Sequence, residues 1–203
     1  GRSAWGARTC VETARTAGRR RPTAGRERGR PILFSAHMDH VGVSANGRCA
    51  AMGADSICNG ADDDASGTVG VVELAEAFAK QGVKPKRSII FLTVSGEEGG
   101  LRGSRYYAEH PSVPIERIVA NVNIDMPTAL VATRDFIAFG AEHSTLGPVA
   151  ASAAQREGFV LSPDPRPEEV VFIRSDQYSF VRQGIPAIYM DGGNQAVDPA
   201  VDA

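Results

Sequence analysis

Three short runs of this chain are apolar almost without interruption, and each is followed by side chains that can bind a metal. The runs cover residues 32–36, 88–94 and 118–124, and the polar residues after them are His37, Glu97, Glu98 and Asp125. Continuous apolar runs of this length indicate strands buried on both faces, as in a parallel sheet covered by helices. This pattern restricts the chain to a small set of layered folds.

The predicted fold class is α/β, a three-layer sandwich with a mostly parallel central sheet. Apolar residues recur at helical spacing over residues 71–79, and helices are also expected near residues 103–109, 145–157 and 176–183. Further extended or apolar segments occur near residues 130–139, 170–173 and 185–190. In open α/β sheets, ligands bind beyond the carboxyl ends of the strands. The polar residues that follow the strands are therefore expected to lie together.

A long Gly-rich loop between the first two strands carries three adjacent aspartates, Asp62, Asp63 and Asp64. Three neighbouring carboxylates repel one another, and a divalent cation is the simplest source of compensating charge. An isolated cluster of this kind is usually a solvated turn. Because this one lies between strands that end in imidazole and carboxylate groups, we expect a metal site for zinc, manganese or cobalt.

The adjacent pair Glu97 and Glu98 predicts a division of labour. Neighbouring side chains in an extended or turn segment point in different directions, so one carboxylate can bind a metal while the other acts as a general base. A pair of metals bridged by a carboxylate activates water for attack on a carbonyl group. The pattern therefore indicates hydrolysis of an amide or an ester.

Four motifs together resemble the co-catalytic di-zinc exopeptidases, which include bacterial leucyl aminopeptidases and the catalytic domain of glutamate carboxypeptidases. The motifs are His37-x-Asp39 and residues 60–67, 97–104 and 123–126, and the match runs from about residue 31 to residue 191. The resemblance implies a phosphorylase/hydrolase-like α/β fold. It also implies a zinc-dependent metallopeptidase, an aminopeptidase that releases N-terminal amino acids from peptides.

The resemblance implies two ligands of a first zinc, one bridging ligand, one ligand of a second zinc, a general base, and a carboxylate that orients the histidine. His37 and Asp125 correspond to the ligands of the first zinc, Asp63 to the bridging ligand and Glu98 to the ligand of the second zinc. Glu97 corresponds to the general base, and Asp39 to the carboxylate that orients the histidine. The implied cofactor is a pair of Zn²⁺ ions, and the implied partner is a peptide substrate attacked by a metal-bridging water. Residues 175–180 and 184–187 resemble the segment that lines the substrate side.

One departure from the family pattern concerns the second zinc, which in the family takes a further histidine from a late segment. The four histidines of this chain are His37, His40, His110 and His143, and none follows residue 191. We therefore expect the second metal to keep only Asp63 and Glu98 and to be weakly held. An alternative is a weakly active or inactive binding module on the same scaffold. A further alternative, cyclisation of N-terminal glutamine on a related fold, is disfavoured by the Asp-Asp-Asp and Glu-Glu motifs.

Charge separates the first thirty residues from the remainder. Residues 1–30 hold nine Arg and two Glu, a net charge of +7, whereas residues 31–203 hold thirteen basic and twenty-two acidic residues, a net charge of −9. The first segment shows no hydrophobic period and is predicted to be disordered. It lacks interleaved aromatic residues, so no nucleic-acid partner is expected. Residues 31–203 are the predicted zinc peptidase catalytic domain, incomplete at its C-terminus.

The remaining expectations concern location and cysteines. No run of eighteen apolar residues occurs, so no membrane span is expected. Cys10, Cys49 and Cys58 do not have the spacing of a zinc site, and Cys49 and Cys58 either form a disulfide or remain free thiols. The family resemblance alone favours an extracellular or periplasmic location. Side-chain specificity and oligomeric state are not determined by the sequence.

Overall fold

The computed structural model describes residues 29–127, 131–198 and 200–201. Six strands form a single sheet in the order β2-β1-β3-β6-β4-β5. Neighbours among β2, β1, β3 and β6 are parallel, β4 is antiparallel to β6, and β5 is parallel to β4. The strands are β1 (Ile32–His37), β2 (Ile89–Val94), β3 (Ala120–Ile124), β4 (Asp135–Phe139), β5 (Val160–Ser162) and β6 (Ala187–Gly192). The predicted α/β class with a mostly parallel sheet is confirmed.

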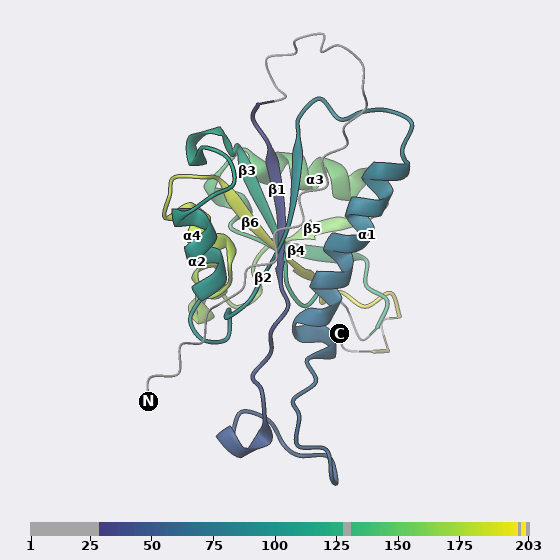
Figure 1. Cartoon of the computed structure of the whole chain (residues 1–203). Coiled ribbons are helices and arrows are strands. Elements are labelled where there is room, and N and C mark those ends of the chain that lie inside the picture. The colour runs from purple at the N-terminus through teal and green to yellow at the C-terminus, as the bar shows by residue number, and fades with distance from the viewer. Residues whose placement is uncertain (1–28, 128–130, 199, 202–203) are drawn as a thin grey trace.

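Helices lie on both sides of this sheet (Figure 1). The α-helices are α1 (Gly67–Lys80), α2 (Arg102–Glu109), α3 (Leu146–Arg156) and α4 (Gln177–Val181). Short helical turns are η1 (Ser44–Asn46), η2 (Ala61–Ser66), η3 (Ile115–Arg117), η4 (Ala141–His143), η5 (Pro167–Glu169) and η6 (Val171–Ile173). The four expected helices are therefore present. The short strand β5 has no counterpart in the expected elements.

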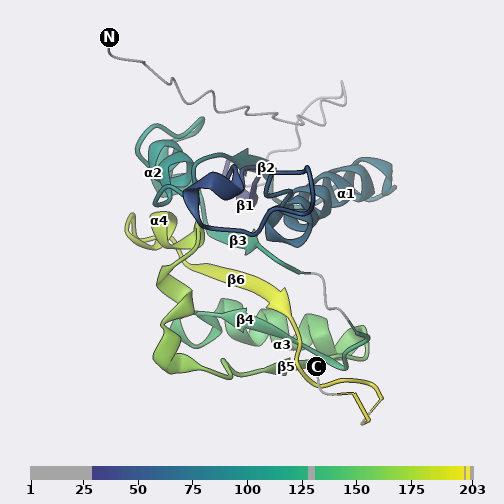
Figure 2. The same cartoon turned by 90° about the horizontal axis from the view of Figure 1, so that it is seen from below.

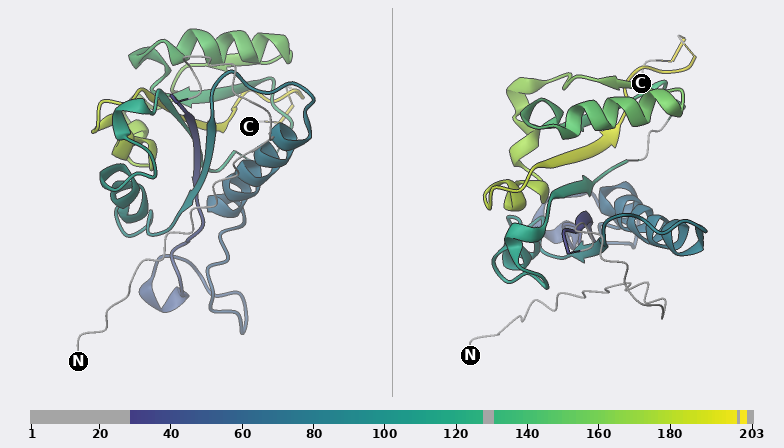
Figure 3. Two further views of the ribbon diagram at one scale, coloured as in Figure 1. Left: turned by 45° about the horizontal axis from the view of Figure 1, so that its top comes forward. Right: turned by 90° about the horizontal axis from the view of Figure 1, so that it is seen from above.

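Alternate residues of the strands pack against opposite helical layers. Leu33 of β1 and Phe180 of α4 are both fully buried in the cluster beneath α2 and α4. On the other face, Phe34 and Phe91 from β1 and β2 pack against Phe78 of α1, with ring centroids 6.0–6.3 Å apart. Helix α3 covers the β4 half of this second face (Figure 3). Burial of both faces explains why the strands are apolar without alternation.

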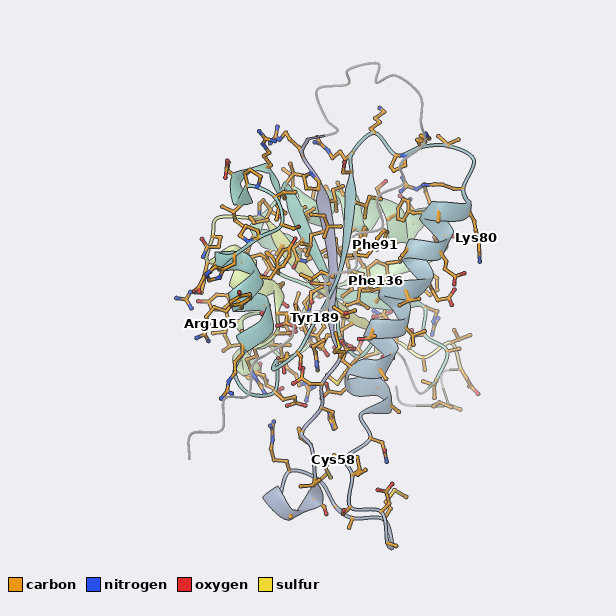
Figure 4. All side chains as sticks on the ribbon, in the orientation of Figure 1. Cys58, Lys80, Phe91, Arg105, Phe136 and Tyr189 are labelled. Atoms are coloured by element: carbon orange, nitrogen blue, oxygen red, sulfur yellow. A yellow bond between two sulfur atoms is a disulfide. The ribbon has the colours of Figure 1, made fainter. Side chains whose placement is uncertain are left out.

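The segment between β1 and α1 projects beyond the sheet (Figure 1). Cys49 and Cys58 form a disulfide within it, with their Cα atoms 6.0 Å apart, and Figure 4 labels Cys58 at this position. Of the two alternatives for these thiols, the structure has the bridge. Cys10 and residues 1–28, which make up most of the Arg-rich segment predicted to be disordered, lie outside the described residues.

The described helices are short in relation to a lipid bilayer. The longest of them, α1, has 14 residues, whereas a transmembrane helix needs about 20 apolar residues. No helix within the described ranges meets the length and hydropathy of a membrane span.

Candidate active site

The carboxyl ends of three neighbouring strands meet at one edge of the sheet. β1 lies between β2 and β3 and is parallel to both, so the residues that follow these strands come together (Figure 2). β1 ends at His37, β2 leads into the loop that carries Glu97 and Glu98, and β3 is followed by Asp125. The aspartate loop enters from the same side, because it connects the projecting segment to the start of α1 (Figure 1).

His37 lies at the centre of the first group of possible ligands. Its Nε2 atom is 3.2 Å from Oδ1 of Asp63 and 3.6 Å from Oδ1 of Asp125, and its side chain is 1% exposed. Donor atoms at about 2.0–2.1 Å from a tetrahedral zinc are separated from one another by about 3.3 Å. These three residues therefore fit a zinc ion in both donor type and spacing.

Asp39 orients the ring of His37 and also contacts the next loop. Nδ1 of His37 is 3.0 Å from the main-chain oxygen of Asp39 and 3.7 Å from its carboxylate. Donation from Nδ1 to Asp39 leaves the lone pair of Nε2 directed at the ligand cluster. The Asp39 carboxylate accepts a hydrogen bond from the main-chain N–H of Glu97, at 3.3 Å. A single residue thus links the imidazole to the loop that carries the proposed base.

The electrostatics of this cluster favour a cation. Burial acts to lower the pKa of His37, but its hydrogen bonds to Asp125, Asp39 and Asp63 outweigh burial and raise that pKa well above its usual range. The same contact with His37 holds the pKa of Asp63 below its usual value. Both shifts mean that the cluster stabilises positive charge at its centre.

Glu97 lies in an environment suited to proton transfer. Its pKa is raised to about 8, first by burial and then by the negative charges of Asp176, Asp125 and Glu98, while His37 acts in the opposite direction. A general base works best when its pKa is near the working pH. A carboxylate with an ordinary pKa would be a poorer proton acceptor at neutral pH.

Asp125 is held by residues that the sequence analysis did not identify as supporting the site. Ser175 donates a hydrogen bond from Oγ to Oδ2 of Asp125 at 2.6 Å, and Asn123 donates from Nδ2 to Oγ of Ser175 at 2.9 Å. Both side chains are buried. Ser175 belongs to the segment 175–180, which was expected to line the substrate side, and its hydroxyl supports Asp125, a possible ligand. The sequence feature that could have indicated this support is Asn123, a polar residue inside a mainly apolar strand.

Asp64 has a structural environment that differs from that of its neighbour Asp63, to which it is joined by a cis peptide bond. Its carboxylate accepts hydrogen bonds from the main-chain N–H groups of His37, Gly67 and Met126, at 3.0–3.2 Å. Burial raises the pKa of Asp64 to about 8, while its bonds to the N–H groups favour the charged form. Asp64 therefore ties together the end of β1, the start of α1 and the segment after β3.

Replacing Asp64 by Asn is expected to destabilise the fold by about 2 kcal/mol, because an amide NH₂ would face a buried N–H and leave one of the three bonds unmade. Chemical denaturation of the metal-free protein measures this change. Asp62→Asn is the matched control, because within the described ranges its Oδ1 accepts a hydrogen bond from Ser66 alone, and the amide oxygen of Asn can still accept it. Equal stability of the two variants would contradict the role given to Asp64.

The predicted site residues thus converge on one edge of the sheet. His37, Asp63 and Asp125 form one group of possible ligands. Glu98 and Asp63 belong to a second group, which also contains His40. The sequence analysis had not considered His40 as a ligand, although it follows His37 by three residues.

An α/β sheet with imidazole and carboxylate groups gathered at the carboxyl ends of its strands is the architecture of a metal-dependent hydrolase. A family model described as "Peptidase family M28" matches residues 17–200. The chain therefore belongs to peptidase family M28. The resemblance to the co-catalytic zinc exopeptidases is confirmed.

Individual relatives agree with this assignment. A solved aminopeptidase from Aneurinibacillus sp. strain AM-1 superposes with a TM-score of 0.62 at 26% identity, covering 87% of this chain and 38% of that one. A probable zinc metalloprotease of Pyrenophora tritici-repentis is 53% identical over 55 residues, which are 27% of this chain and 11% of that protein. The chain thus matches well under half the length of these relatives.

The expectation of an extracellular or periplasmic location is wrong. The curated relatives include a vacuolar membrane protease of Pyricularia oryzae, 32% identical over 91 residues that make up 45% of this chain and 8% of that protein. Proteins with the same name in Coccidioides posadasii and Tuber melanosporum also match. The location had been inferred from the general family resemblance and from no residue of the chain, and these relatives contradict it.

Proposed function

We propose that this chain is the catalytic part of a zinc-dependent aminopeptidase, which hydrolyses the N-terminal peptide bond of its substrate. The observation that carries the proposal is the meeting of His37, Asp63 and Asp125 at ligand spacing, beside Glu97 with its raised pKa. The similarity to the Aneurinibacillus aminopeptidase supports the choice of aminopeptidase among peptidases.

The donor set fits zinc. His37, Asp63 and Asp125 would hold a first ion, since they offer one nitrogen and two carboxylate oxygens, the donor types that zinc takes in catalytic sites. Asp63 directs Oδ1 to His37 and Oδ2 to His40, which suits a bridging ligand. Bound zinc supplies a Lewis acid for the substrate carbonyl and brings the pKa of water down to about 7.

The chain's own residues carry the proton transfers. Glu97 accepts a proton at its carboxylate from the attacking water as the water oxygen bonds to the carbonyl carbon. Glu97 then donates this proton to the leaving amine nitrogen as the C–N bond breaks. Asp39 keeps the loop of Glu97 in place through the main-chain N–H and orients His37 through its main-chain oxygen.

Hydrolysis of leucine p-nitroanilide by the zinc-loaded chain tests this function. The free anilide is expected to be hydrolysed, and N-acetyl-leucine p-nitroanilide is expected to be inert because an aminopeptidase requires a free amino terminus. Dialysis against a chelator should abolish hydrolysis, and added zinc should restore it. Equal hydrolysis of both substrates would rule out an aminopeptidase, and no hydrolysis of any peptide by the zinc-loaded chain would rule out catalysis.

Ser175→Ala is expected to weaken zinc binding at the first site by about 10- to 100-fold, because it removes the hydrogen bond that orients Asp125. Competition with a chromogenic chelator measures the affinity. Ser179→Ala is the matched control, since Ser179 is also a buried serine but pairs with Ser104 rather than with Asp125. Unchanged zinc affinity in Ser175→Ala would show that this bond does not support the metal.

A further inference from the structure

A second group of ligand atoms adjoins the first and shares Asp63 with it. Nδ1 of His40 is 3.0 Å from Oε1 of Glu98 and 3.6 Å from Oδ2 of Asp63. The three ligand atoms lie within 4.8 Å of one another. The two distances from Nδ1 of His40, 3.0 and 3.6 Å, lie on either side of the value of about 3.3 Å expected between the donors of a tetrahedral zinc. The group therefore has the donor types and the spacing of a metal site.

Two of these atoms lack the partners that buried polar atoms normally have. Nδ1 of His40 and Oε1 of Glu98 are shielded from solvent, and neither has a hydrogen bond among the described residues. They face each other at 3.0 Å without the geometry of a hydrogen bond. A buried donor or acceptor without a partner costs about 1–3 kcal/mol. A cation held between the two atoms would remove this cost for both.

The surroundings of His40 and Glu98 hold these two atoms in place. Gly60 has φ +61°, and a Cβ atom there would lie 2.6 Å from Cγ of His40, so the glycine leaves the space that the imidazole occupies. Arg48 donates a hydrogen bond from Nη2 to Oε2 of Glu98 at 2.6 Å. This bond occupies one carboxylate oxygen and leaves Oε1 facing the imidazole.

We propose that His40, together with Asp63 and Glu98, holds the second zinc ion. This assignment of a ligand rests on the proposed function. Two further histidines in the described ranges have other surroundings: His110 stacks on an aromatic ring of α2, and His143 is exposed beside a phenylalanine ring of η6. The assignment adds a third ligand to Asp63 and Glu98, the two that the sequence was expected to supply.

Zinc content of a His40→Gln variant tests the assignment, because glutamine approximates the size of histidine but is a poor zinc ligand. After equilibration with zinc and desalting, elemental analysis is expected to find about two ions per chain in the wild type and about one in the variant. His110→Gln is the matched control and should keep both ions. Cobalt titration followed by visible absorption gives an independent count of occupied sites.

A second variant guards against a purely structural effect. His40→Ala should also lose one ion, and added imidazole should restore it by supplying the missing nitrogen ligand. Circular dichroism verifies that both variants are folded. Restoration by imidazole is not expected if His40 only packs against Gly60.

The outcomes separate the assignment from the proposed function. Two ions retained in His40→Gln, or a single ion in the wild type, would overturn the assignment of His40 without bearing on hydrolysis. A wild type that binds two ions and loses one in His40→Gln, yet does not cleave leucine p-nitroanilide, would overturn the aminopeptidase proposal and leave the second metal site in place.

Discussion

Replacing Glu97 by Gln is expected to lower kcat for leucine p-nitroanilide by about 10²- to 10⁴-fold, the usual contribution of a positioned general base. The amide cannot accept the proton of the attacking water, whereas its size and its main-chain bond to Asp39 are preserved. KM and zinc content should therefore change little. Steady-state kinetics on protein of known zinc content measures the effect.

Glu109→Gln provides the control for this substitution. Glu109 is an exposed glutamate at the end of α2, so the same chemical change should leave kcat unaltered. Full activity in Glu97→Gln would refute its role as the base. A loss of zinc in parallel with kcat would instead show that Glu97 acts by holding the metal.

Asp63→Asn is expected to empty both metal positions, because Asp63 is the one carboxylate common to both groups of ligands. Zinc content should fall from about two ions per chain to less than one, and kcat by more than about 10³-fold, since the metals supply both the activated water and the polarised carbonyl. Elemental analysis and kinetics on the same preparation test both expectations. The bridging role predicts a larger loss of zinc than His40→Gln produces.

The neighbouring Asp62 is the control for this variant. Asp62 accepts a hydrogen bond from Ser66 within the same turn and belongs to neither group of ligands. Asp62→Asn should keep its zinc and its activity. If Asp63→Asn retained one tightly bound ion, Asp63 would be a ligand of a single metal and no bridge would exist.

The comparison of Asp63 and Asp64 shows which features of the site can be predicted from the local sequence and which cannot. Three consecutive aspartates between glycines indicate a charged loop that needs compensation, and the family resemblance singles out the middle one. Only the fold shows why Asp64 differs: three N–H groups from segments far apart in the chain converge on its buried carboxylate. Such convergence depends on tertiary contacts, so no spacing in the sequence reveals it.

His40 is a second residue whose contacts the sequence alone did not reveal. Its position three residues after His37 is plain in the sequence, but the second zinc was expected to keep only Asp63 and Glu98 as ligands. The orientation of the His40 ring depends on the space that Gly60 leaves for it. It also depends on the loop after β2, which places Glu98 next to the ring. Packing of this kind is decided by residues distant in sequence.

The sequence by itself determined the α/β class, the positions of the first three strands along the chain and the residue types at their ends. It could do so because burial on both faces requires uninterrupted apolar strands, and because parallel strands bring their carboxyl ends to one edge. The tertiary structure decided which oxygen of each carboxylate meets which imidazole, that Ser175 supports Asp125 and that Cys49 pairs with Cys58. These features depend on direct contacts between side chains that only the packed chain brings together.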